Sequence, residues 1–227
     1  MYLYLLIDIA IIIFPLAISF ERKRINYFSK IKSVALSTLI VSTVYIVWDV
    51  FATSRGHWSF NYDYLVGLSL LGLPLEEILF FITVPYSCLF AYEALAYFLK
   101  DAGMPLPDKL LPIIGVAIAL LSIAFFRNEY TFLAVLSVGL SILAVSMLDR
   151  HFFSSRLYWA YIAVTFMLFF IFNFLLTSLP IVEYSDLATT GLRVTTIPIE
   201  DFMFNFSMLT LYLAGHLYFM RRLKPNQ

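Results

Sequence analysis

The sequence has few charged residues, one cysteine and no excess of either charge. Only 13% of its 227 residues are charged, whereas 62% are hydrophobic and the mean hydropathy is +0.88. So little polar surface cannot cover a soluble domain. Fifteen basic residues balance fifteen acidic ones, which excludes the basic excess of a nucleic-acid binder. Cys88 alone excludes a disulfide scaffold and an all-cysteine metal site. An integral membrane protein remains.

Motifs for the common cofactors are missing as well. The eight glycines form neither a G-x-G-x-x-G nor a P-loop. The three histidines, His57, His151 and His216, are far apart in the sequence, and no D-D-x-x-D cluster is present to hold magnesium on a diphosphate. The last hydrophobic segment has no lysine for a retinal Schiff base. The sequence therefore predicts no bound cofactor and no metal.

Seven hydrophobic segments predict an all-α integral membrane fold with seven transmembrane helices. A bilayer core of about 30 Å requires roughly 20 apolar residues per helix. The predicted spans are 2–20, 33–52, 74–98, 110–126, 130–148, 158–179 and 197–220. Residues 64–98 are too long for one straight span, so we predict a break at Pro74 and an interfacial or re-entrant segment over 64–73.

The basic residues predict the orientation of these spans. With the N-terminus outside and the C-terminus cytoplasmic, twelve Lys and Arg residues lie on the cytoplasmic side and three on the other. Such a bias follows the positive-inside rule. The twelve are Arg22, Lys23, Arg24, Lys30, Lys32, Lys100, Lys109, Arg150, Arg156, Arg221, Arg222 and Lys224, and the three are Arg55, Arg127 and Arg193.

Two stretches of the sequence match at a constant offset of 124 residues. Residues 48–53 (WDVFAT) align with 172–177 (FNFLLT), and 74–77 (PLEE) align with 198–201 (PIED). We predict two parallel three-helix repeats, in residues 1–98 and 130–227, joined by a linker helix within 99–129. The linker lets both copies insert with the same orientation. Pro followed by an acid also marks ordinary helix starts, but the shared offset favours a duplication.

Acidic residues inside the hydrophobic segments are the candidate functional groups. An intramembrane carboxylate is costly and suggests a function or shared protons. Asp8 and Glu93 lack a counterpart at the offset, and we interpret them as solvated or locally hydrogen-bonded acids. No Lys or Arg lies inside a span to pair with the acids. Six polar residues are expected at one level near the outer ends of the helices: Asp49, Glu76, Glu77, Asn173, Glu200 and Asp201.

Neighbouring acids in the two matching motifs cannot all face one point. Adjacent helical residues point about 100° apart. We therefore expect one member of each pair, Glu76–Glu77 and Glu200–Asp201, to face a cavity while the other is held by nearby polar groups. Clustered carboxyl groups in a low dielectric cannot all ionise, so an acid and a base would stand side by side.

Four motifs together resemble one enzyme family. WD-x-x-x-T (48–53), GHWSFN (56–61), PLEE-x-x-FF-x-x-VP (74–85) and PIEDFMFNF (198–206) are similar to the flavin-independent lycopene cyclases built from two homologous membrane subunits, here fused in one chain. The resemblance implies conversion of the acyclic ends of lycopene into β-rings, giving γ- or β-carotene, with no cofactor and no net redox change. Related pairs act on C50 carotenoids, so the substrate stays open. Lipid-dissolved carotenoid and other carotenoid-pathway enzymes are the implied partners.

The expected reaction starts when a protonated carboxyl group gives a proton to the terminal double bond of the polyene. A second double bond then closes on the cation, and a carboxylate removes a ring proton. A proton-coupled membrane carrier, or a carotenoid-binding protein without activity, is the alternative. The candidate catalytic residues are Asp49, Glu76, Glu77, Glu200 and Asp201, and the candidate substrate-binding residues are Asn173, Trp48, Phe80, Phe81, Phe202 and Phe204.

Overall fold

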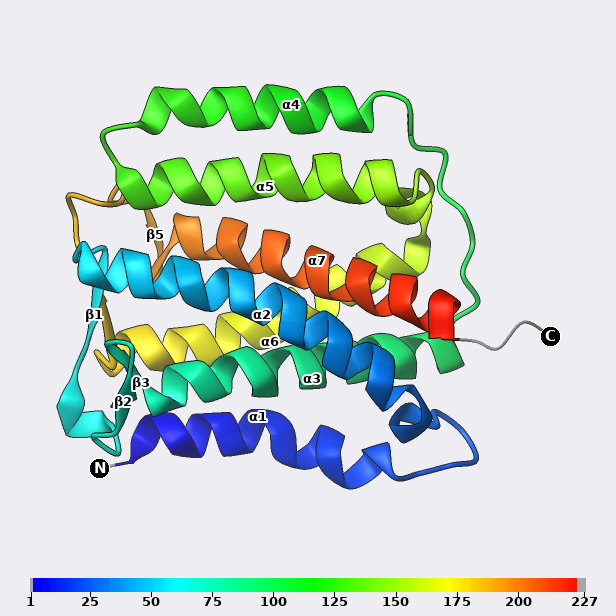
Figure 1. Cartoon of the computed structure of the whole chain (residues 1–227), viewed down its shortest axis with the longest axis horizontal. Helices are drawn as coiled ribbons and strands as arrows, with labels where there is room; N and C mark the ends of the chain where they lie inside the picture. The colour runs from blue at the N-terminus through cyan, green and yellow to red at the C-terminus, as the bar shows by residue number, and fades with distance from the viewer. Residues whose placement is uncertain (1, 224–227) are drawn as a thin grey trace.

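The computed structural model describes residues 2–223, and each predicted hydrophobic segment forms an α-helix in it. The helices lie side by side and alternate in direction, with α1 at one edge and α4 at the other (Figure 1). Their bounds lie within about one turn of the predicted ones. For α4 this agreement includes the 3-10 helix Ser122–Phe125, which continues the α-helix. The helices are α1 Leu3–Ser19, α2 Ile31–Ser54, α3 Leu75–Phe98, α4 Leu111–Leu121, α5 Glu129–Leu148, α6 Arg156–Ser178 and α7 Ile199–Leu223.

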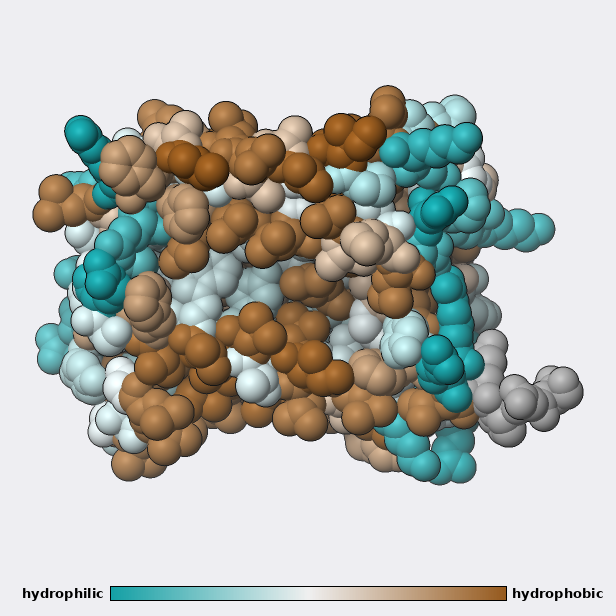
Figure 2. All heavy atoms as spheres, turned by 45° about the horizontal axis from the view of Figure 1, so that its top comes forward, coloured by the Kyte–Doolittle hydropathy of each residue, from teal (hydrophilic) through white to brown (hydrophobic). Residues whose placement is uncertain are grey.

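Four of the helices are long and apolar enough to cross a membrane. They are α3, α5, α6, and α2 together with the 3-10 helix Tyr27–Lys30 that precedes it. Helices α1 and α4 are apolar but shorter, and α7 carries acids in its first turn and two arginines in its last. Figure 2 shows one face on which hydrophobic side chains cover the middle while hydrophilic ones gather toward two ends. This distribution suits a membrane protein.

Short strands connect the helices at one end of the bundle, and the sequence did not predict them. β1 (Trp58–Phe60) pairs antiparallel with β4 (Val182–Tyr184). Two hairpins join β2 (Ser69–Leu70) to β3 (Leu73–Pro74) and β5 (Arg193–Val194) to β6 (Ile197–Pro198). Each strand of the first half has its counterpart 124 residues later. In the β1–β4 ladder Ser59 pairs with Glu183, its own counterpart, so the two strands are related by a local two-fold axis.

Residues 64–73 form the β2–β3 hairpin and the loop before it rather than a re-entrant segment. The turn needs positive φ at both central residues, and Leu71 (φ 57°) and Gly72 (φ 84°) adopt it. Leu71 is 71% exposed at the tip of the hairpin. The prediction that this segment lies at the membrane interface stays a prediction. Pro74 ends the hairpin and precedes the first residue of α3, as the predicted break requires.

The central helices pack across the two halves of the chain. α1 packs on α3, and α5 packs on α7 in the corresponding way. Between these pairs, α2 packs on α7 and α6 packs on α3. Residues 58–60 and 182–184 bridge the halves at the strand end. Polar groups near the starts of α3 and α7 are thereby brought together at the strand end of the bundle.

Helix α4 packs chiefly on α5, through two glycines that let the backbones approach closely. A Cβ added at Gly139 would lie 2.5 Å from the Ala119 backbone nitrogen. We expect Gly139→Ala to lower the free energy of unfolding by about 1–3 kcal/mol. The added methyl group would meet backbone atoms, which cannot move aside as the end of a flexible side chain can. Thermal unfolding in detergent measures this. Gly103→Ala, where nothing lies within 4 Å, is the matched control, and equal midpoints for the two variants would contradict the expectation.

Candidate active site

Four of the predicted polar residues line one small cavity at the strand end of the bundle. The cavity has a volume of about 60 Å³ and is lined by Asp49 of α2, Glu77 of α3, Asn173 of α6 and Asp201 of α7. Asp49 and Asn173 are counterparts at the 124-residue offset, and so are Glu77 and Asp201. Each half of the chain therefore contributes two groups to a single site.

Asp201 is held by three hydrogen-bond donors. Its Oδ1 accepts from the Tyr130 hydroxyl at 2.6 Å, and its Oδ2 accepts from Asn173 Nδ2 and the Tyr184 hydroxyl, each at 2.7 Å. Burial raises the pKa of Tyr184 well above its ordinary value, so this hydroxyl keeps its proton and donates. An ionised carboxylate only accepts hydrogen bonds, and three donors are the surroundings that this form needs.

Asp49 and Glu77 form a second, different arrangement. Asp49 Oδ1 accepts from Trp58 Nε1 at 2.9 Å, and Glu77 Oε2 accepts from the Tyr4 hydroxyl at 2.6 Å. The two carboxyl groups interact directly with each other. A pair of carboxyl groups in contact away from bulk water shares one proton more readily than it carries two negative charges. The site therefore combines a carboxyl pair suited to hold a proton with a carboxylate held by donors.

Glu76 and Glu200 do not line the cavity, although both are almost fully buried. Glu76 Oε1 accepts from the Val66 backbone N–H at 2.6 Å. Glu200 Oε1 accepts from the Thr190 backbone N–H at 2.8 Å and from the Thr131 hydroxyl at 2.6 Å. Each glutamate thus ties the start of its helix to the preceding loop. As expected, one acid of each pair lines the cavity and the other is held by neighbouring groups.

The predicted aromatic residues divide in the same way. Phe80 and Phe204 line the cavity, and Trp48 packs on Phe204 with ring centroids 4.9 Å apart. Phe81 and Phe202 are not among the lining residues. Phe81 is buried beside Phe80, and Phe202 packs on Phe169.

Sequence reasoning missed the hydroxyl donors and part of the aromatic wall. The Tyr4, Tyr130 and Tyr184 hydroxyls all bind cavity carboxylates. Trp58 lies in the GHWSFN motif, so the sequence offered a signal for it. The three tyrosines follow no motif or spacing that distinguishes them from the other twelve. Trp58 and Tyr184 come from the β1–β4 ladder, so this ladder covers the cavity at the strand end.

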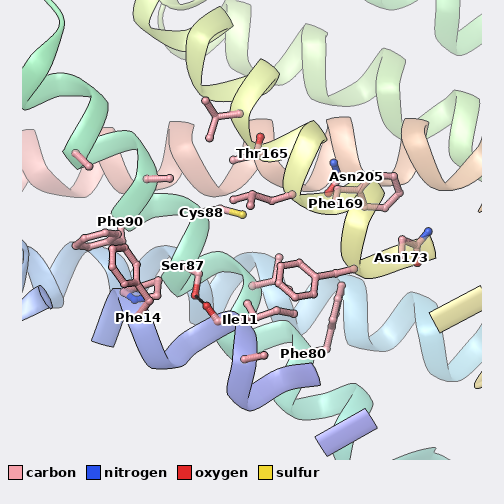
Figure 3. Close-up of a pocket in the computed structure, with 18 of the residues that line it drawn as sticks. Ile11, Phe14, Phe80, Ser87, Cys88, Phe90, Thr165, Phe169, Asn173 and Asn205 are labelled. Carbon is pink, nitrogen blue, oxygen red and sulfur yellow. Dashed lines mark hydrogen bonds between the residues drawn. The ribbon is translucent and has the colours of Figure 1, made fainter. Parts of the chain in front are cut away.

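A long apolar groove of about 460 Å³ continues from the cavity between α1, α3 and α6. The groove and the cavity share Phe80, Phe169, Asn173 and Leu176. Figure 3 shows Asn173 at one end of the lining, Cys88 in the middle, and Phe14 and Phe90 toward the other end. Its lining on α3 reaches from residue 80 to residue 98, which is about 27 Å at 1.5 Å per residue.

The two remaining acids of the predicted spans lie outside this cavity. Asp8 accepts a hydrogen bond from the Thr83 hydroxyl at 3.4 Å, in line with its interpretation as a locally bonded acid. Glu93 forms an ion pair with Lys30 and binds His216 Nε2 at 2.8 Å. No Lys or Arg lies inside a predicted span, but Glu93 is paired nevertheless, because Lys30 lies just before α2 and extends to it.

The family model for lycopene cyclase matches residues 1–95 and 127–219. The two matched ranges contain all four polar residues of the cavity and leave out the segment that contains α4. No curated protein and no solved structure shows a significant match to the chain.

Proposed function

The chain belongs to the lycopene cyclase family, and on this premise we propose that it is a β-cyclase that converts acyclic carotenoid ends into β-rings. The observation that carries the proposal is the meeting of Asp49, Glu77 and Asp201 in one aromatic-lined cavity at the end of an apolar groove. Ring closure is an isomerisation, so it requires a proton donor and a proton acceptor. Lycopene yields γ-carotene after one closure and β-carotene after two.

The proposal includes a membrane arrangement in which all seven helices span the bilayer. The N-terminus then lies outside and the cavity is near the outer surface, while the C-terminus is cytoplasmic. Residues 1–98 and 130–227 form parallel three-helix repeats, and 99–129 contain the linker helix α4. The recurrence of β1–β3 as β4–β6, and the corresponding packing of α1 on α3 and α5 on α7, support this view. Lys224, one of the twelve cytoplasmic basic residues, lies outside the described residues.

The first step is protonation of the terminal double bond. The bond takes a proton from the Glu77–Asp49 pair, with Glu77 as the donor, and a tertiary carbocation forms. Glu77 is suited to this role because its carboxyl group lines the cavity and interacts with Asp49, so that one proton stays on the pair until the double bond takes it. The two carboxylates left behind then face the new cation, which balances their charge. The Tyr4 hydroxyl fixes the other side of Glu77 at 2.6 Å. A correctly placed general acid typically raises the rate of such a proton transfer by about 10²–10⁴-fold.

The second and third steps close the ring and restore neutrality. A neighbouring double bond of the same chain attacks the cation, forming a carbon–carbon bond and moving the positive charge onto the ring. Asp201 then removes a ring proton, and the electron pair of that C–H bond becomes the double bond of the β-ring. Three donors orient Asp201 toward this task and keep its charge close to the cation.

The cation must be protected while it exists. Aromatic faces near a desolvated cation contribute about 0.5–2 kcal/mol each, and Phe80, Phe204 and Trp58 line the cavity. The β1–β4 ladder covers the site, which limits capture of the cation by water. A proton carrier would instead need acids in series across the bilayer. Glu93, near the opposite end of α3, is paired with Lys30 and hydrogen-bonded to His216, which favours the cyclase.

Expression in bacteria that accumulate red lycopene tests the proposal. We expect the cells to turn yellow-orange, and chromatography to show γ- or β-carotene in place of lycopene. Cells that express Glu77→Gln to the same level serve as the control and keep the red colour. Unchanged lycopene in cells that contain folded wild-type protein would overturn the proposal and favour a carrier or a binding protein.

A further inference from the structure

We propose that the duplicated fold, over the residues that the structure describes, retains only one polyene groove, so that the enzyme cyclises one end of its substrate at a time and releases it before a second ring can form. This inference rests on the proposed function and adds to it how the substrate is bound and released. It follows from the difference between the α3–α6 interface and its counterpart, the α2–α7 interface.

The counterpart of the groove is filled by side chains. Cys88 lies in the middle of the open groove (Figure 3), and its counterpart at the 124-residue offset is Tyr212. Tyr212 is fully buried, and its hydroxyl is 2.7 Å from Ser42 Oγ of α2. The phenol ring therefore occupies the interface that the smaller thiol leaves open on the other side.

Close approach of the backbones seals the same interface. Ser37 Oγ of α2 donates to the Tyr212 carbonyl oxygen at 2.7 Å. A Cβ added at Gly215 would lie 2.6 Å from Ser37 Oγ, so α2 and α7 touch at this point. The counterpart of Gly215 in the open groove is Ala91, which lines it. No polyene can lie between α2 and α7 in this arrangement.

A single groove fixes the position of the unreacted end. The groove leads from Asn173 and Phe80 beside the acids to Phe98, about 27 Å away along α3. A conjugated polyene is a stiff rod and cannot fold back over this length. While one end occupies the cavity, the other lies near the far end of α3, where Phe98 is 71% exposed. Closure of a second ring therefore requires the molecule to leave and bind again end for end.

A variant that fills the open groove tests the number of grooves. Cys88→Tyr copies the residue that closes the counterpart, and we expect it to lower kcat/KM for lycopene by about tenfold or more, equivalent to about 1.4 kcal/mol. Ala117→Tyr adds the same ring on the exposed face of α4 and serves as the control. A Cys88→Tyr protein with the wild-type unfolding temperature that keeps half of its activity would reveal a second groove and overturn the inference.

A chase experiment tests release of the product without any mutation. Purified wild-type protein in lipid vesicles first converts ¹³C-labelled lycopene, and excess unlabelled lycopene is added when the first ring products form. We expect labelled monocyclic carotene to persist, because the released product competes with the added substrate. Labelled lycopene that passes directly to the bicyclic product would overturn the inference while leaving the cyclase proposal intact. Absence of any cyclic product would instead refute the proposed function.

Discussion

Replacement of Glu77 by glutamine lowers the rate of cyclisation by about 10²–10⁴-fold, the typical contribution of a positioned acid. The amide keeps nearly the same shape and still accepts a hydrogen bond from Tyr4, but it has no proton of suitable acidity for the alkene. The partner Asp49 then lies beside an amide in place of a carboxyl group. Product formation from lycopene in vesicles, followed by chromatography, measures the effect.

Glu76→Gln is the matched control because Glu76 is the adjacent residue in the first turn of the same helix and is fully buried. Its side chain accepts from the Val66 backbone N–H and does not line the cavity, and a glutamine oxygen can accept the same bond. We expect cyclisation by folded Glu76→Gln to stay close to wild type. Equal losses in the two variants would show that the helix start, rather than the proton on Glu77, is what the reaction requires.

Replacement of Asp201 by asparagine has the second large effect, a loss of about 10²–10³-fold of the kind seen when one preorganised electrostatic group is removed. In the proposed mechanism the change removes both the proton acceptor and the negative charge next to the cation. It also turns one acceptor oxygen into an NH₂ group among three donors, from Tyr130, Asn173 and Tyr184. Initial rates in vesicles, together with the thermal unfolding midpoint, separate the loss of chemistry from the loss of stability.

Glu200→Gln is the corresponding control in the second half. Glu200 accepts from Thr131 and Thr190 and lies outside the cavity lining. If Glu200→Gln abolished turnover and Asp201→Asn did not, the assignment of the acceptor would be wrong. The opposite result, together with the expected loss in Glu77→Gln, would show that the PLEE and PIED motifs each contribute their second acid to the reaction.

Much of the fold could be predicted because hydrophobic length and repetition are properties of local sequence. Each apolar segment became a helix, and Pro74 marks the break before α3. The strands could not be predicted, because each has two or three residues and the β1–β4 pairing joins segments that are far apart in the chain. The pairing depends on how the two halves meet.

The site was predictable in its residue types but not in the direction of its side chains. The offset identified Asp49, Asn173 and the two acidic pairs, and helical geometry required each pair to separate. Which acid faces inward depends on where the loop N–H groups of Val66 and Thr190 lie. The tyrosine donors arrive from α1, α5 and β4, and no local pattern signals a contact made only in the assembled bundle.

In the proposed mechanism, differences between the two halves give their carboxyl groups different roles in one site. Asp49 is matched by Asn173, so one half supplies a second carboxyl group next to its acid while the other supplies an amide donor. This substitution makes one arrangement suited to hold a proton and the other suited to hold a negative charge. Duplication alone would give two equal acids, whereas the proposed reaction needs an acid and a base.

Cyclisation by the purified protein in vesicles prepared in D₂O tests the central claim most directly. The account holds that Glu77 takes its proton from solvent between turnovers and that a different group, Asp201, removes the ring proton. Mass spectrometry should then find one deuterium in each ring formed, without any added flavin or nicotinamide. Rings formed without deuterium, or only in the presence of a reduced cofactor, would contradict acid-initiated cyclisation by these carboxyl groups.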